Sequence, residues 1–382
     1  MTYFNFLFKK VIKNKINLIP LIIMILTICT CFFFNNNNAN TYSYENDAVR
    51  EVKLSKKNIA EYSASSIKDN EHKEIDQSNL KQQKEMLHQN ERKLSDIKND
   101  DFQEAYDIDI LQTSKDFEIN KDSQGGSSSG ELGQAIRRDN LRFQYLKVNN
   151  IEKNSDYYPT KSITFTTWIL QNIVPVIFTI CLIFILSQIF SDSYIDKIDI
   201  TNLIPISRRK KLFIETLFGT TISLASLFLF ILISYLIGFS LGGSTSWKYP
   251  FLSWQSNNDM YFQGTEIVFF KSMLLSALSI IILVELVYLI TYLIRNKVAT
   301  LFVNLLLICG LIVGSMIIEP IQKISKYLPT TYFNSVSVVS GQFSKQIGNF
   351  SVSYSSGIYC LVISAIILLV ILLLTTQKLK KY

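Results

Sequence analysis

The chain lacks several features that would point to catalysis or to a disulfide-stapled fold. It has five cysteines, but none between residues 35 and 160, so a disulfide framework is excluded for that segment. It contains no G-x-x-x-x-G-K-[ST] or H-E-x-x-H sequence, which argues against a P-loop and a zinc protease site. The two histidines, His72 and His88, lack the clustering of a metal site. We therefore expect no catalytic, cofactor-binding or metal-binding residue in this chain.

Long apolar runs are what the chain does have. A bilayer core of about 30 Å requires about 20 apolar helical residues, and six runs approach that length. The runs are too long and continuous for barrel strands, and only helices or closed barrels satisfy their backbone in lipid. The sequence thus predicts an all-α polytopic membrane protein with six transmembrane helices. The expected spans are 17–34, 163–190, 212–240, 266–294, 299–318 and 357–375.

Lysine and arginine are concentrated on one side of the expected spans. They occur in residues 1–16, in the loop 191–211, in the turn between spans four and five, and in the tail 376–382. Cytoplasmic segments carry such an excess, so both termini and the loop 191–211 should face the cytoplasm. Richness in Asn, Lys and Ile further suggests the plasma membrane of a Gram-positive bacterium, where the chain would contact membrane lipid.

The charge balance divides the chain into two parts. Residues 35–160 hold 18 basic and 23 acidic residues, whereas the rest of the chain holds 20 basic and 8 acidic residues. The alkaline pI of about 8.9 therefore reflects membrane anchoring. A nucleic-acid interface would need a basic patch on one soluble face, so we expect no nucleic-acid partner.

Residues 35–160, which we call the inserted domain, should form an extracellular helical domain. Leucine repeats every seven residues in its first half, and good helix formers fill the gaps, which predicts one long helix over about 68–112. The glycines and serines of 124–130 indicate a flexible turn, followed by a second, amphipathic helix. The apolar residues of these two helices are Leu80, Leu87, Leu94, Leu132, Ile136, Phe143 and Leu146. The domain is either a solvated spacer or a surface for a partner or substrate.

The loop between spans two and three reads SDSYIDKIDITNLIPISRRKK, from Ser191 to Lys211. A short helix can follow Phe190, Pro205 would end it, and the basic cluster would fix the start of span three at the interface. This order of features resembles the permease subunits of ABC-2 type transporters, which have six spans and a coupling helix at this place, ending in a leucine-proline-small residue-arginine pattern. By that resemblance the ATPase-coupling residues are Asp192, Asp196, Lys197, Asp199, Asn202, Leu203, Pro205, Ser207, Arg208 and Arg209.

The resemblance extends to both sides of this loop. Residues 1–16 look like the family's amphipathic elbow, in which Phe4, Phe8 and Val11 can face lipid. Residues 319–356 look like its short extracellular helices. Such a permease would pair with a second permease subunit, identical or not, and with a separate cytoplasmic ABC ATPase that binds ATP and Mg²⁺.

The inserted domain departs from the family's pattern, because ordinary members have a short loop after span one. The departure favours an exporter of a peptide, a bacteriocin or another amphipathic molecule over simple drug or polysaccharide export. The alternative is a non-transporting membrane sensor or immunity protein that binds a peptide through this domain.

Two acidic residues fall inside the expected bundle. Glu215 lies about one turn inside span three, where it can pair with Arg208 or Lys211 at the interface. Glu285 is deeper, nine residues before Ile294, which is about 14 Å by helix rise. Charge in hydrocarbon is costly, so each of these intramembrane candidates needs a partner or water. For Glu215 we favour the interfacial pairing, whereas Glu285 is a candidate for a substrate or gating role.

Aromatic residues gather near the outer ends of the spans. The tryptophans are Trp168, Trp247 and Trp254, and several tyrosines accompany them. Such residues typically form an interfacial belt, which is the interpretation we prefer to a substrate-binding role.

Overall fold

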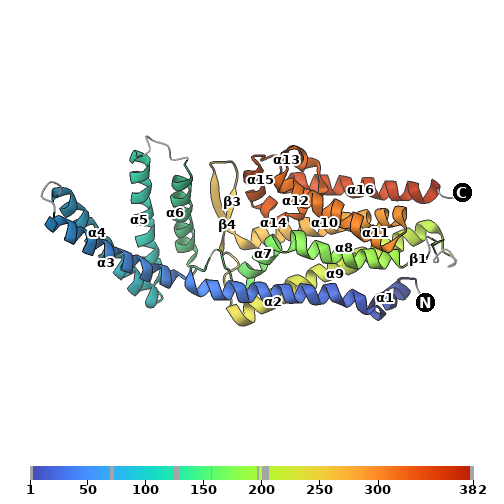
Figure 1. Cartoon of the computed structure of the whole chain (residues 1–382), viewed down its shortest axis with the longest axis horizontal. Coiled ribbons are helices and arrows are strands. Elements are labelled where there is room, and N and C mark those ends of the chain that lie inside the picture. Colours follow the sequence, from blue (N-terminus) through green and yellow to red (C-terminus); the bar gives the residue numbers. More distant parts are fainter. Residues whose placement is uncertain are drawn as a thin grey trace.

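The computed structural model describes residues 3–68, 73–123, 130–155, 157–195, 198–199 and 206–378. The molecule is elongated, with a helical bundle at one end and the inserted domain at the other (Figure 1). The N- and C-termini lie together at the end of the bundle farthest from the inserted domain. We call this the terminal end, and the opposite end of the bundle the domain end.

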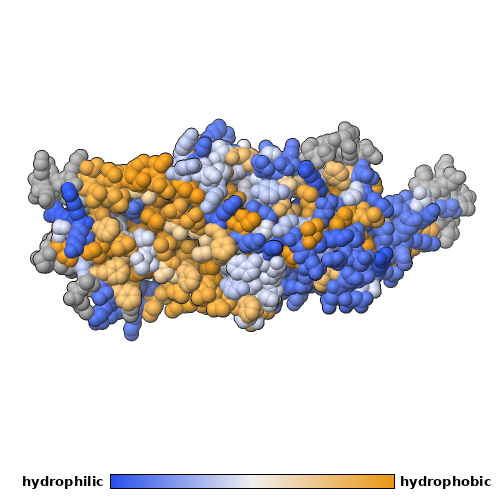
Figure 2. All heavy atoms as spheres, turned by 180° about the vertical axis from the view of Figure 1, so that it is seen from behind, coloured by the Kyte–Doolittle hydropathy of each residue, from blue (hydrophilic) through white to orange (hydrophobic). Residues whose placement is uncertain are grey.

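Six helical stretches among the described residues are long and apolar enough to cross a membrane, which confirms the predicted fold class. Their lipid-facing side chains form an apolar band over the bundle, with hydrophilic residues on the inserted domain and at the terminal end (Figure 2). In chain order the stretches are built from α2 (Leu18–Thr41), α7 and α8 (Ser162–Asn172, Thr179–Ser191), α9 (Arg208–Gly242), α10 (Thr265–Ile294), α11 and α12 (Lys297–Asn304, Gly310–Ile317), and α16 (Tyr354–Lys378).

Two of the spans contain a π-helical turn. In the second span the turn η2 covers Val174–Phe178 and contains Pro175, whose missing N–H cannot continue the α-helical bonding. Thr179 Oγ1 donates to the Val174 carbonyl oxygen at 3.1 Å. The fifth span has a similar turn, η4, at Leu305–Cys309. The wider turns re-satisfy the backbone, so both helices stay continuous across the apolar band.

The inserted domain consists of α3 (Tyr44–Lys68) packed on α4 (Lys73–Lys98), and α5 (Phe102–Ser123) packed on α6 (Glu131–Asn149). The predicted single helix over 68–112 is wrong, because the chain breaks between α4 and α5, where Asp100 has φ 59°. Aspartate tolerates this left-handed conformation better than most residues. The predicted second helix exists as α6, and the glycine-serine turn of 124–130 lies almost wholly outside the described residues.

Aromatic packing and one buried ion network hold the inserted domain together. Tyr44, Tyr106 and Phe143 form the core, with ring centroids 5.7 to 6.4 Å apart. Beside them the Lys93 ammonium, only 1 % exposed, lies 2.9 Å from an Asp109 carboxylate oxygen and also binds Glu51. These contacts join α3, α4, α5 and α6 into one unit.

A β-hairpin that the sequence did not reveal lies between the inserted domain and the bundle (Figure 1). Its strands are β3 (Pro250–Trp254) and β4 (Met260–Gly264), paired antiparallel with Ser253 opposite Tyr261. The Trp254 amide donates to the Ser340 carbonyl oxygen at 2.7 Å. Gly341, which follows Ser340, has φ 72°. A Cβ at Gly341 would lie 2.2 Å from the Trp254 carbonyl oxygen, so only glycine allows this approach.

The remaining elements are short. Helix α1 (Tyr3–Lys13) and the turn η1 (Lys15–Asn17) precede the first span. Between the fifth and sixth spans the chain forms α13 (Glu319–Ile324), η5 (Ser325–Tyr327), η6 (Pro329–Phe333), α14 (Ser335–Val339) and α15 (Gln342–Ile347). These short helices lie at the domain end (Figure 1).

Candidate functional sites at the two ends of the bundle

At the terminal end, helix α1 lies against the third span. Tyr3 and Leu7 are buried, and the Phe4 ring meets the Phe218 ring edge-on at 5.1 Å. Phe8 is 52 % exposed, on the side that can meet lipid. The elbow thus uses Phe4 for packing within the protein and keeps Phe8 outside.

Glu215 connects three helices at this end. Its side chain is buried, and its two carboxylate oxygens accept hydrogen bonds from the Tyr3 hydroxyl at 2.6 Å and the Tyr288 hydroxyl at 2.9 Å. Tyr3 belongs to α1, Glu215 to α9 and Tyr288 to α10. Sequence reasoning considered only basic partners and missed both tyrosines, which lie 212 and 73 residues away along the chain.

Asp192 connects the loop between the second and third spans to two other segments. Its carbonyl oxygen accepts from the Lys10 ammonium at 3.2 Å, and its carboxylate lies 3.2 Å from the Lys297 ammonium at the start of α11. Burial lowers the pKa of Lys10, while the Asp192 and Glu215 carboxylates act in the opposite direction. The loop is therefore fastened to the elbow and to the fifth span.

The other predicted coupling residues are only partly described. Ser207 caps α9 by accepting from the Lys210 amide at 3.4 Å, and Arg208 and Arg209 are the first residues of that helix. Instead of the predicted short helix, Tyr194–Ile195 (β1) pairs antiparallel with Ile198–Asp199 (β2). Asp196, Lys197, Asn202, Leu203 and Pro205 lie outside the described residues.

Glu285 stands apart from both ends. Its side chain is 6 % exposed, in a stretch of α10 where Leu283 and Val284 are also buried. Its Oε2 atom has no hydrogen-bond partner among the described residues. In the described part of the chain, one oxygen of this buried carboxyl group is thus without a hydrogen bond, and no bond joins it to Glu215.

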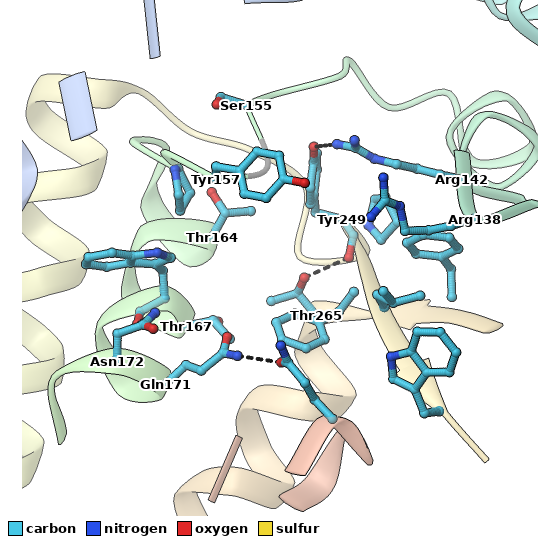
Figure 3. A pocket seen from close by; sticks show the side chains of 18 residues that line it. Arg138, Arg142, Ser155, Tyr157, Thr164, Thr167, Gln171, Asn172, Tyr249 and Thr265 are labelled. Atoms are coloured by element: carbon cyan, nitrogen blue, oxygen red, sulfur yellow. Dashed lines mark hydrogen bonds between the residues drawn. The ribbon is translucent and has the colours of Figure 1, made fainter. Parts of the chain in front are cut away.

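A cavity of about 390 Å³ opens at the domain end. It lies between α6, the start of α7 and the β-hairpin, and Figure 3 shows Arg138 and Arg142 on the side opposite Gln171 and Asn172. Its lining residues are Arg138, Arg142, Ser155, Tyr157, Pro159, Thr164, Thr167, Trp168, Gln171, Asn172, Tyr249, Pro250, Phe251, Leu252, Trp254, Phe262, Thr265 and Gln342. We call it the domain-end pocket.

Tyr249 organises one wall of this pocket. Its hydroxyl accepts from Arg142 Nη2 at 2.8 Å and from the Asn154 amide at 3.1 Å, and its carbonyl oxygen accepts from Thr265 Oγ1 at 2.7 Å (Figure 3). Arg142 is buried, so these bonds fix a desolvated guanidinium in place. The inserted domain is thereby joined to the first turn of α10.

Sequence reasoning missed the arginines of this pocket but noticed some of its aromatic residues. Trp168 and Trp254, expected in an interfacial belt, both line the pocket, whereas Trp247 does not. Within the described part of the chain, no group of three His, Cys, Asp or Glu side chains is placed to hold a metal ion. The chemistry available at the pocket is therefore hydrogen bonding and charge from arginine, beside apolar walls.

The sequence matches one known family of membrane transport proteins, in agreement with the six membrane-spanning stretches. Residues 16–374 match the family described as ABC-2 family transporter protein, which is nearly the whole chain. No curated protein and no solved structure matches the chain. The family implies an association with an ABC ATPase. The chain belongs to the ABC-2 transporter family and is a multi-pass permease subunit of an ABC transporter.

Proposed function

We propose that this permease exports a peptide, a bacteriocin or another amphipathic molecule, driven by a separate ATPase that binds ATP and Mg²⁺. The observation that carries the proposal is the fastening of Asp192 to Lys10 and Lys297. An ATPase seated against the loop 191–211 would move the elbow and the fifth span together with the loop. The basic residues of this loop support its placement in the cytoplasm.

Helix α10 offers a path between the two ends of the bundle. It has 30 residues, so it spans about 45 Å at the rise of an α-helix. Tyr288, near one end, binds Glu215, and Thr265, its first residue, binds Tyr249 at the domain-end pocket. A movement of the elbow and α9 would therefore be transmitted to the pocket as a rigid displacement of α10.

The membrane arrangement supports a paired permease. The sixth span is mostly exposed: only 17 % of its most apolar stretch is buried within one chain. This leaves a large apolar surface for lipid or for a second permease subunit. Two permease subunits would together enclose a path for the substrate across the membrane, which one subunit alone would not enclose. Alternating access of that path to the two sides of the membrane is the expected mechanism.

Affinity purification of the tagged permease in mild detergent tests the coupling. The wild-type chain should recover an ATPase whose hydrolysis responds to the permease, and Asp192→Asn and Arg208→Gln should weaken that response. Asp259→Asn, in the exposed turn of the hairpin, is the matched control and should leave it unchanged. Recovery of the folded permease without any ATPase would contradict the exporter and favour the sensor or immunity protein.

A further inference from the structure

The domain-end pocket borders the apolar band of the bundle. Asn35 Nδ2 donates to the carbonyl oxygen of Pro159 at 3.0 Å, and Pro159 lines the pocket. Phe34, the neighbour of Asn35 on the first span, is 58 % exposed. The centroid of its ring lies 5.9 Å from that of Tyr158, the residue before Pro159. A molecule in the pocket would therefore sit beside lipid, at the level where headgroups meet hydrocarbon.

The arginines that line the pocket are engaged by the protein itself. Arg138 Nε lies 3.0 Å from an Asp139 carboxylate oxygen, and Arg138 is also hydrogen-bonded to the Tyr157 side chain. Arg142 donates to the Tyr249 hydroxyl at 2.8 Å. A ligand that bound either guanidinium would have to displace one of these partners, and the lost bond would offset most of the gain. The pocket therefore gives little advantage to an anionic ligand.

Other polar side chains in the lining are bonded within the protein as well. The Thr164 and Thr167 hydroxyls donate to carbonyl oxygens three and four residues earlier in the chain, at 2.8 and 2.9 Å. Gln171 Nε2 donates to Gln342 Oε1 at 2.7 Å (Figure 3). Ser155 differs, because its buried hydroxyl has no hydrogen-bond partner in the described structure. A ligand can therefore bond to Ser155 without breaking an existing contact.

The remaining walls of the pocket are apolar. Trp168 of α7, Phe251 of β3 and Phe262 of β4 supply aromatic surface. The volume of about 390 Å³ is in the range of sites for drug-sized molecules, about 300–1,000 Å³. A ligand that covers these rings removes apolar surface from water, which is the main favourable contribution to such binding. The lining thus suits a largely apolar ligand that has a hydrogen-bonding group.

We infer that the domain-end pocket binds an uncharged amphipath of the membrane, of the acylglycerol type. Its hydrocarbon lies against Trp168 and Phe251, and its hydroxyl or ester group bonds to the Ser155 hydroxyl. The position of the pocket beside lipid gives such a molecule a route of entry from the bilayer. This site follows from the pocket alone and requires neither the ATPase nor export, so it can be refuted while the proposed function holds.

Photo-crosslinking in membranes that contain the full permease tests this site. The probe is a diacylglycerol with a diazirine in one acyl chain, and labelled peptides are identified by mass spectrometry. Labels should appear on the pocket segments, residues 155–172 and 249–254. They should also appear on α16, which is mostly exposed and reports ordinary contact with lipid. Labels on α16 without labels on the pocket segments would overturn the inference.

A phosphatidylglycerol that carries the same diazirine chain tests whether the ligand is uncharged. Because the arginines are already engaged, the ratio of labels on the pocket segments to labels on α16 should agree for the two probes within about threefold. A ratio higher than this for the anionic probe would assign the pocket to an anionic headgroup and overturn the inference.

Two variants localise the labels of the diacylglycerol probe. Gln171→Trp fills the pocket and should lower the ratio of pocket labels to α16 labels about tenfold. Ser155→Ala removes one hydrogen bond and should lower this ratio about fivefold. Ser240→Ala is the matched control, because Ser240 is exposed on α9 and bonds to the carbonyl oxygen of Leu236, so the ratio should stay unchanged. Pocket labels that persist in both pocket variants would overturn the inference.

Discussion

The two ends of the bundle differ in how much space borders their charged residues. At the terminal end, the Lys10 ammonium binds the Asp192 carbonyl oxygen, the Lys297 ammonium binds the Asp192 carboxylate, and the cavity beside Lys10 and Asp192 is only about 10 Å³. At the domain end, Arg138 and Arg142 border about 390 Å³. Contacts therefore fill the terminal end beside Asp192, whereas the domain end leaves a cavity between the inserted domain and the bundle.

This difference suits a transporter in which the ends have separate tasks. The bonds of Asp192 to Lys10 and Lys297 can transmit a displacement of the loop to the elbow and the fifth span, because packed interfaces deform little. An open cavity can change its shape when its walls move. Helix α10 contributes Tyr288 at the terminal end and Thr265 at the cavity, so the proposed motion reaches both.

The largest effect is expected in the buried ion network of the inserted domain. Lys93→Met leaves Asp109 buried without its ammonium partner, which should destabilise the domain by about 3–5 kcal/mol. Thermal unfolding monitored by circular dichroism measures the loss. The exposed pair of Lys57 and Glu61 provides the control, Lys57→Met, which should change stability by less than about 1 kcal/mol. Equal melting of the two variants would contradict the assigned role of Lys93.

The pH dependence of this network has a definite sign. Burial alone would lower the pKa of Lys93, but the Asp109 and Glu51 carboxylates raise it above its ordinary value of 10.5. A raised folded-state pKa stabilises the domain below the unfolded pKa, and this contribution is lost only as the pH rises through the folded value. The contribution of Lys93 should thus be complete at neutral pH and disappear only in strong alkali.

At the terminal end, Glu215→Ala should have the next largest effect. It removes the acceptor of two buried tyrosine hydroxyls, each of which costs about 1–3 kcal/mol when a bond is lost, so we expect about 2–6 kcal/mol in total. The apparent melting temperature in detergent should fall accordingly. Glu319→Ala removes a carboxylate that is 75 % exposed and should melt like the wild type. A similar melting temperature for both variants would show that Glu215 is not the joint between α1, α9 and α10.

Several elements were predictable because their signal is local. The six spans follow from runs of apolar residues, and α6 follows from its amphipathic spacing. Even there the buried face was only partly predicted, since Phe143 and Leu146 are buried but Leu132 is 57 % exposed. The spacing of apolar residues predicts that a helix forms more reliably than it predicts which of those residues are buried by the rest of the protein.

The missed features depend on contacts between distant residues or on weak turn signals. The break at Asn99 to Asp101 has no glycine or proline, only residues that tolerate a left-handed backbone. The β-hairpin is five residues a side and lies between longer apolar runs, so its alternation was hidden. The pocket could not be derived, because Arg142 and Tyr249 are 107 residues apart and meet only when the inserted domain contacts the hairpin.

At the domain end, Tyr249→Phe should have a moderate effect. The change removes the hydroxyl that Arg142 and the Asn154 amide bind, and should loosen the inserted domain from the hairpin by about 1–2 kcal/mol. Hydrogen exchange should become faster in α6 and in residues 150–155. Tyr261→Phe, on the neighbouring strand and 43 % exposed, is the control and should leave exchange unchanged. Unchanged protection of α6 in Tyr249→Phe would mean that other contacts hold the domain in place.

The smallest effect on stability, and the sharpest on coupling, is expected for Lys297→Gln. Its ammonium is 44 % exposed, so loss of the Asp192 contact should cost less than about 1 kcal/mol. The loop would nevertheless be released from α11, and ATP hydrolysis by the partner should respond less to the permease. Lys323→Gln removes a comparable exposed pair at the domain end and should preserve the response. If both variants kept full coupling, the displacement would have to pass from the loop through Lys10 and the elbow alone.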